Sequence, residues 1–81
     1  MSQTTIRSPL PGTFYRRPAP DQPVFKEAGD TVSEGETIGL IEVMKSFHEI
    51  PSKVSGTITA FNVENEDAVT AGQDLATVET G

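Results

Sequence analysis

The sequence contains two similar halves, and this internal repeat constrains the fold more than any other feature. EAGDTVSEGETIGLIE (27–42) aligns with ENEDAVTAGQDLATVE (64–79) without a gap, and SPLPGT (8–13) resembles SKVSGT (52–57). Each half has the form Gly-Thr, strand, charged turn, Val-x-x-Gly, strand. Neither half is large enough to bury its own apolar face. We therefore expect the two halves to pack together about a pseudo-twofold axis.

The secondary structure is expected to be entirely β. Helical periodicity is weak, whereas turn residues recur between short runs rich in Val, Ile and Thr, such as TIGLIEV, GTITAFNV and LATVE. This pattern predicts short antiparallel strands in one small sandwich or barrel. The D-x-V-x-x-G spacing of each half predicts an inward valine and a glycine with positive φ. With 81 residues, we expect a single domain over 1–81, with its core over about 6–79.

The junction between the repeats, VMKSFHE, is expected to cross between the halves as a tight hairpin over 42–48. Lys45 then lies at an exposed tip, with both chain termini at the opposite end of the domain. Its neighbours Val43, Met44 and Phe47 are apolar, where an ordinary hairpin turn has Asn, Gly or Asp. Exposed apolar residues at a turn indicate that another protein binds there. Geometry alone leaves the alternative open that Lys45 is simply a solvated turn residue.

Few residues of this chain are suited to catalysis. A free lysine near its reference pKa of about 10.4 is protonated, and nothing nearby in the sequence would activate Lys45 as a nucleophile. The chain has one histidine, His48, and no cysteine, so no metal-ligand spacing is present. The acidic residues Glu64, Glu66 and Asp67 lie on a charged turn and are interpreted as solvated. We predict no enzyme activity and no metal site, and Lys45 is better explained as a target of a separate modifying enzyme.

Charge and composition exclude two classes of partner. Twelve acidic against six basic residues give a formal charge of −6 and a pI near 4.5. Nucleic acid and anionic membrane surfaces both attract basic proteins, so neither is expected as a partner. The sequence has no long apolar run that would indicate a signal peptide or a membrane span. The absence of cysteine is compatible with a reducing cytosol, and we expect a cytoplasmic location.

The first half carries about seven residues more than the second, and the surplus falls in YRRPAPDQPVF (15–25). This segment holds half of the six prolines. Proline fixes φ and removes a hydrogen-bond donor, so the segment is expected to leave the sheet as a stiff protruding loop. The residues alone are equally compatible with a plain surface connection.

Several stretches resemble one known family. The hairpin sequence E-V-M-K-S-F-H-E-I is similar to the biotinylation motif of biotin carrier domains, whose core is commonly Glu-Ala-Met-Lys-Met. The similarity extends to S-P-L-P-G-T-F-Y-R (8–16), P-A-P-D (18–21), V-S-G-T (54–57) and V-E-N-E-D-A-V-T-A-G-Q-D-L (63–75). It covers nearly the whole chain, from about Ile6 to Glu79. The chain thus resembles the biotinyl/lipoyl-attachment family and, within it, carriers of the acetyl-CoA carboxylase type.

The resemblance implies a flattened barrel-sandwich of two four-stranded sheets with covalent biotin on Lys45. It also implies three partners: a biotin protein ligase, a biotin carboxylase and a carboxyltransferase. Acetyl-CoA is the expected acyl acceptor, as a step in fatty-acid synthesis. The proline-rich insertion, 17–24, corresponds to a "thumb" near the biotin. The residues expected to be recognised by the ligase are Glu42, Val43, Met44 and Ser46, and those expected near biotin are Pro18, Ala19, Pro20 and Asp21.

Two residues of the hairpin depart from the biotinylation motif. Val43 stands where alanine is most common, and Ser46 replaces the usual Met or Leu, so either change can alter acceptance by a ligase.

The rival interpretations are a lipoyl carrier, a carrier of another biotin-dependent carboxylase, an unmodified carrier-like regulator and a purely structural domain. Met44 and the thumb argue against the lipoyl carrier. The chain is interpreted as either a short stand-alone carrier or an excised domain.

Overall fold

The computed structural model describes residues 2–80 and contains eight strands in two four-stranded sheets. Every strand pair is antiparallel. One sheet has the order β1-β8-β6-β3 and the other β5-β4-β2-β7. The all-β sandwich expected from the sequence is confirmed. The strands are β1 (Ser2–Arg7), β2 (Gly12–Tyr15), β3 (Thr31–Val32), β4 (Thr37–Val43), β5 (Ser46–Pro51), β6 (Gly56–Phe61), β7 (Asp67–Val69) and β8 (Asp74–Thr80).

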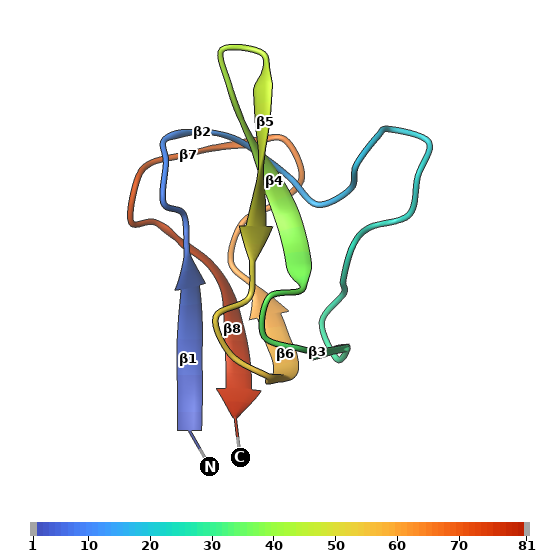
Figure 1. Ribbon diagram of the computed structural model, residues 1–81, viewed down its shortest axis with the longest axis vertical. Helices are drawn as coiled ribbons and strands as arrows, with labels where there is room; N and C mark the ends of the chain where they lie inside the picture. The colour runs from blue at the N-terminus through green and yellow to red at the C-terminus, as the bar shows by residue number, and fades with distance from the viewer. Residues whose placement is uncertain (1, 81) are drawn as a thin grey trace.

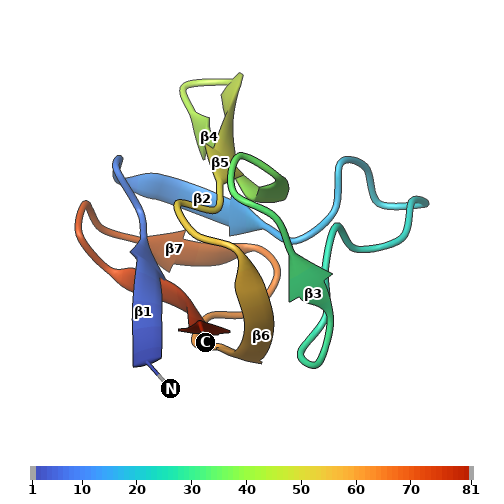
Figure 2. The same ribbon diagram turned by 60° about the horizontal axis from the view of Figure 1, so that its bottom comes forward.

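The hairpin formed by β4 and β5 projects from one end of the domain, and both termini lie at the other end (Figure 1). Figure 2, turned by 60°, shows β2 and β7 running across the base of that hairpin. No helix in the described part of the chain is long and apolar enough to cross a membrane. The arrangement of hairpin and termini agrees with the expectation drawn from the repeat.

The core lies between the two sheets and is built from equivalent positions of the two halves. The inward valines of the repeat, Val32 and Val69, are each 4% exposed. Burying a side chain of this size stabilises the folded state by about 1.5–3 kcal/mol relative to leaving it in water. The two halves therefore share one core. Its buried members are Ile6, Phe14, Val32, Ile38, Ile41, Ile50, Ile58, Val63, Val69, Leu75, Ala76 and Val78.

The pseudo-twofold relation extends to individual hydrogen bonds. Ser8 and Ser52, both buried, each donate from Oγ to the carbonyl oxygen two residues ahead, at 2.5 and 2.6 Å. Because a buried hydroxyl without a partner is costly, this bond explains why a serine is accommodated at each position. Three further hydrogen bonds of the first half have an equivalent in the second half. The Glu27 N–H donates to Asp30 Oδ2 as the Glu64 N–H does to Asp67 Oδ2, and the Ser33 N–H donates to Glu36 Oε1 as the Thr70 N–H does to Gln73 Oε1. The Gly29 N–H donates to the Ile58 carbonyl as the Glu66 N–H does to the Phe14 carbonyl.

The glycines of the Val-x-x-Gly turns have the conformation that the spacing predicts. Gly35 has φ of 90° and Gly72 has φ of 84°, a region that side chains with a β-carbon rarely adopt. Their N–H groups donate to the carbonyl oxygens of Ser52 and Ser8, both at 2.7 Å. Each turn is thus tied to the residue that directly follows a strand, Ser52 after β5 and Ser8 after β1.

One pair of equivalent positions breaks the symmetry. Gly29 in the first half has φ of 98°, and the aligned residue in the second half is Glu66, with φ of 71°. A left-handed conformation costs a residue with a β-carbon roughly 1–2 kcal/mol. Glu66 therefore occupies a position that favours glycine, and strain of this kind is typical of functional sites.

We expect Glu66→Gly to stabilise the domain by about 0.5–1 kcal/mol. The relief of the left-handed conformation exceeds the roughly 0.5–1 kcal/mol that glycine loses through extra freedom in the unfolded chain. Urea denaturation should show a higher midpoint with an unchanged slope. The matched control is Glu64→Gly, two residues earlier and without a positive φ, which should lower the midpoint. Equal destabilisation by both changes would contradict the strain at Glu66.

Candidate functional site

The β4–β5 hairpin places Lys45 at its tip. Glu42 pairs with Phe47 and Val43 with Ser46, so Met44 and Lys45 form a two-residue turn. Both turn residues have positive φ, 50° and 68°, as a type I′ turn requires. Asn-Gly or Asp-Gly is the usual choice for this turn, and Met-Lys is unfavourable in it. The strand pairing on either side imposes a backbone that exposes both side chains.

The residues around Lys45 differ in their packing. Met44 is 94% exposed and Phe47 is 57% exposed, whereas Val43 is partly buried and packs against the core. Lys45 and Ser46 are also exposed. The tip therefore presents a primary amine between exposed side chains, on a strand anchored by Val43. Such a tip is accessible to a modifying enzyme from several directions.

A cleft of about 310 Å³ lies between this hairpin and the proline-rich segment. The segment belongs to residues 16–30, between β2 and β3, which contain no strand. It projects beside the hairpin in Figure 1. Asp21, expected near a cofactor, is not among the residues that line the cleft. The lining residues are Tyr15, Arg17, Pro18, Ala19, Pro20, Glu42, Phe47, Asn65 and Glu66.

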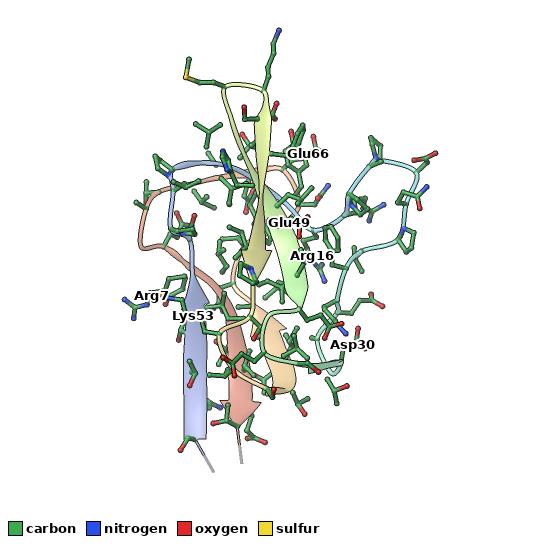
Figure 3. All side chains as sticks on the ribbon, viewed as in Figure 1. Arg7, Arg16, Asp30, Glu49, Lys53 and Glu66 are labelled. Carbon is green, nitrogen blue, oxygen red and sulfur yellow. The ribbon has the colours of Figure 1, made fainter. Side chains whose placement is uncertain are left out.

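Arg16 anchors the base of this proline-rich loop. Its N–H donates to Asn65 Oδ1 at 2.8 Å, and its carbonyl accepts from the Phe25 N–H at 2.8 Å. Its guanidinium lies 4.3 Å from the ring centroid of Phe61, and Nη2 donates to the Lys26 carbonyl at 3.2 Å. Because both ends of the loop and the β6–β7 turn bind this one residue, the wall of the cleft is held in place. Figure 3 shows Arg16 at the root of the loop.

The floor of the cleft combines an aromatic pair with a carboxylate. The ring centroids of Tyr15 and Phe47 are 5.8 Å apart, in a tilted arrangement that is favourable for aromatic side chains. The Tyr15 hydroxyl donates to Glu42 Oε1 at 2.9 Å. This hydrogen bond to a carboxylate raises the pKa of Tyr15 above its ordinary value, with smaller contributions from burial and from the charges of Glu42 and Glu66. Tyr15 thus senses both carboxylates of the cleft.

Tyr15 is the only tyrosine of the chain, so ultraviolet absorbance reports its ionisation alone. We expect Glu42→Gln to lower the pKa of Tyr15 substantially and Glu66→Gln to lower it less, with Glu64→Gln as an unaffected control. A group whose pKa is raised on folding contributes stability below its unfolded pKa, so this contribution is lost above about pH 10. A pKa of Tyr15 that does not respond to Glu42→Gln would refute the hydrogen bond as its cause.

Sequence reasoning missed five residues of this site: Tyr15, Arg16, Phe47 as a cleft residue, Asn65 and Glu66. Most of these residues belong to no sequence pattern that would indicate a shared site, because the cleft is formed by segments far apart in the sequence. Glu66 did give one, since it aligns with a glycine of the first half. Among residues 2–80, no group of three or more His, Asp or Glu side chains is arranged to hold a metal ion.

A strand-paired hairpin that displays an exposed lysine beside a small cleft is the arrangement expected of a carrier domain. A family model described as "Biotin-requiring enzyme" matches residues 4–78. The chain therefore belongs to the biotin/lipoyl-attachment family. The resemblance inferred from the hairpin motif is confirmed, and biotin is the cofactor of the class.

Relatives of this chain include biotin carboxyl carrier proteins of acetyl-CoA carboxylase. The protein of Porphyra purpurea is 45% identical over 76 residues, which are 94% of this chain and 48% of that protein. The protein of Pseudomonas aeruginosa is 38% identical over 78 residues, which are 96% of this chain and 50% of that protein. The chain thus spans about half the length of the curated relatives that it matches.

Among solved structures, the urea carboxylase of Kluyveromyces lactis contains a similar domain. The match has a TM-score of 0.78 at 25% identity, and covers 98% of this chain and 6% of that one. The same fold therefore occurs as a small part of a much longer carboxylase chain.

Proposed function

We propose that this domain carries biotin on the Nζ of Lys45 and presents it to the two active sites of a biotin-dependent carboxylase. The exposed amine at the rigid tip is the single observation that carries this proposal. Biotin would supply a ureido nitrogen that takes up a carboxyl group and releases it to an acceptor. The domain itself contributes attachment, orientation and docking, and the chemistry belongs to the cofactor and the partner enzymes.

The residues of the cleft fit such a group. Small-molecule sites typically have volumes of about 300–1,000 Å³, and this cleft lies at the lower end of that range. The aromatic pair and the prolines offer apolar contact, and the carboxylates accept hydrogen bonds from N–H groups. Glu42 lies three residues before Lys45, so their Cα atoms are at most about 10 Å apart. An arm of roughly ten single bonds of about 1.5 Å reaches that far. Pro18, Ala19 and Pro20 would then contact the resting arm.

The tip is the surface that a biotin protein ligase would recognise. Met44 and Ser46 offer exposed side chains on either side of the amine, and Glu42 and Val43 fix the strand that leads to it. The valine at 43 is compatible with this role because its side chain packs inward. Attachment to a long flexible arm on a rigid tip raises the local concentration of biotin at both partner sites.

The partners that we propose are a biotin protein ligase, a biotin carboxylase and a carboxyltransferase. The similarity to carriers of acetyl-CoA carboxylase supports acetyl-CoA as the acyl acceptor, with malonyl-CoA for fatty-acid synthesis as the product. We retain the cytoplasm as the expected location.

The test is co-expression of the full chain with a biotin ligase, followed by intact mass spectrometry and peptide mapping. We expect one biotinyl group, on Lys45. The biotinylated domain should then be carboxylated by a biotin carboxylase supplied with MgATP and bicarbonate. A lipoyl group at this position, or no modification at all, would contradict the proposed function. A biotinyl group that supports only a propionyl- or urea-specific carboxylase would overturn the acetyl-CoA assignment and leave the carrier role in place.

A further inference from the structure

The cleft beside the hairpin contains three charged groups: Glu42 from β4, Glu66 from the β6–β7 turn and Arg17 from the proline-rich loop. The ion pairs among residues 2–80 join Arg7 with Asp74 at 3.3 Å and Lys26 with Glu36 at 2.7 Å. No residue of the cleft takes part in either. Two carboxylates and one guanidinium give the lining a formal charge of −1.

Neutral donors bind both carboxylates. Glu42 accepts from the Tyr15 hydroxyl at 2.9 Å, and Glu66 accepts a longer bond from Asn65 Nδ2 at 3.4 Å. The raised pKa of Tyr15 indicates that both negative charges act on the cleft floor. Arg17 belongs to the opposite wall, where its Nη1 lies 3.5 Å from the Pro20 carbonyl. Two anionic side chains therefore meet an occupant from the hairpin side, against one cation on the loop.

Glu66 occupies this place at a conformational cost. Its φ of 71° matches the φ of 98° of Gly29 at the equivalent position in the first half. Figure 3 shows Glu66 on the side of the hairpin that faces the loop. A glycine would satisfy the backbone better, so the carboxylate itself needs an explanation.

We propose that the cleft is selective for charge: Glu42 and Glu66 favour an uncharged arm in the cleft and repel the same arm once it bears a carboxyl group. This inference rests on the proposed function. The uncharged ureido group offers N–H donors to carboxylates. On a partner enzyme, MgATP would transfer its γ-phosphoryl group to an oxygen of bicarbonate and release ADP. The ureido nitrogen would then bond to the bicarbonate carbon and lose its proton, while the C–O bond to the phosphorylated oxygen breaks and phosphate leaves. The arm thereby gains a negative charge. The arm then has one donor fewer and is repelled by two carboxylates.

Because of this selectivity, carboxylation would change the preferred position of the arm. The uncharged (unloaded) arm rests beside the loop. The arm that bears the carboxyl group (the loaded arm) extends into solvent, where an acceptor enzyme can bind it. The repulsion acts at a partly exposed site, so we expect it to lower the ratio of docked to free arm roughly fivefold. High salt should weaken it, because the Debye length falls to about 3 Å at 1 M.

The test uses the full chain biotinylated on Lys45 and labelled with ¹⁵N. Amide shifts of Ala19, Phe47 and Asn65 are compared in the unmodified chain, in the biotinylated chain, and after loading with ¹³C-bicarbonate, MgATP and a catalytic amount of biotin carboxylase. The ¹³C resonance of the carboxyl group reports loading independently of the cleft. We expect the shifts caused by biotin to fall back toward the unmodified values when the arm is carboxylated, by up to about fivefold if the docked fraction is small. In Glu66→Gln they should largely persist, and Glu64→Gln should behave as the wild type.

Each outcome has one meaning. Equal shifts with the unloaded and loaded arms would overturn charge selectivity and leave the carrier function intact. A loaded arm with larger shifts would mean that Arg17 dominates, which also overturns the inference. If biotin on Lys45 moves no amide of the cleft, the arm does not rest there, and both the resting site and the inference fail. A chain that takes no biotin refutes the proposed function instead.

Discussion

The full chain carrying Lys45→Arg is expected to gain no biotin when co-expressed with a biotin ligase, whereas the wild type is modified nearly completely. The guanidinium stays protonated at all accessible pH and is a very poor nucleophile toward an activated acyl group. Lys45 is exposed at the tip, and its side chain takes part in neither of the ion pairs among residues 2–80. Loss of modification should therefore be complete while the fold is unchanged.

The measurement is intact mass together with the urea midpoint, and the control is Lys53→Arg. Lys53 is also exposed but lies in the β5–β6 connection, away from the hairpin tip. We expect the control to be biotinylated like the wild type and both variants to unfold at the wild-type midpoint. Biotin found on the Lys45→Arg chain, or lost from the Lys53→Arg chain, would mean that the hairpin tip is not the attachment site.

The largest effect on stability is expected from Gly56→Ala, at about 3 kcal/mol of destabilisation. A β-carbon at position 56 would collide with the carbonyl oxygen of Glu79 and lie 2.9 Å from Val78 Cγ1. Both neighbours belong to β8, next to β6, so the two strands would have to move apart. For a domain of this size the total free energy of unfolding is on the order of 4–12 kcal/mol, so the loss is a large fraction of it.

The matched control is Gly29→Ala, because Gly29 has φ of 98° and open space around its position. Its cost is conformational alone, about 1–2 kcal/mol. Urea denaturation of both variants separates steric from conformational effects. If Gly56→Ala lost no more stability than Gly29→Ala, the close approach of β6 and β8 at this glycine would be refuted.

The equivalent glycine of the first half, Gly12, has the same environment in the hairpin sheet. A β-carbon there would collide with the carbonyl oxygen of Glu42 and lie 2.8 Å from Ile41 Cγ2. Glu42 and Ile41 align with Glu79 and Val78 in the repeat. The glycine of the Gly-Thr pair is therefore required for the same reason in both halves. The neighbouring strand passes so close to it that no β-carbon can be accommodated.

The repeat explains why so much of the fold was predictable. Alignment of the halves fixed which valines point inward and which glycines have positive φ, and it placed the junction lysine at a hairpin tip. The positive φ of Met44 and Lys45 was not predictable from their residue types, because both normally avoid that region. It results from strand pairing on both sides of a two-residue turn, which is a property of the whole hairpin.

The cleft was largely beyond sequence reasoning. The prolines at 18 and 20 predicted a stiff loop, and they line the cleft, but nothing in the pattern indicated that Asn65 and Glu66 would face them. That contact depends on Arg16, which joins the root of the loop to the β6–β7 turn through Asn65. A single hydrogen bond between residues 49 positions apart leaves no periodicity to read. The mismatch of Glu66 with Gly29 was the one available indication.

The two ends of the chain enter and leave the domain side by side, since Ser2 pairs with Thr80 on adjacent strands β1 and β8. A module with neighbouring ends can be spliced into a surface loop of another polypeptide without stretching its host. The modified hairpin would then point away from the junction, because it lies at the far end of the long axis (Figure 1). This portability is consistent with a matching domain that makes up only 6% of a far longer carboxylase.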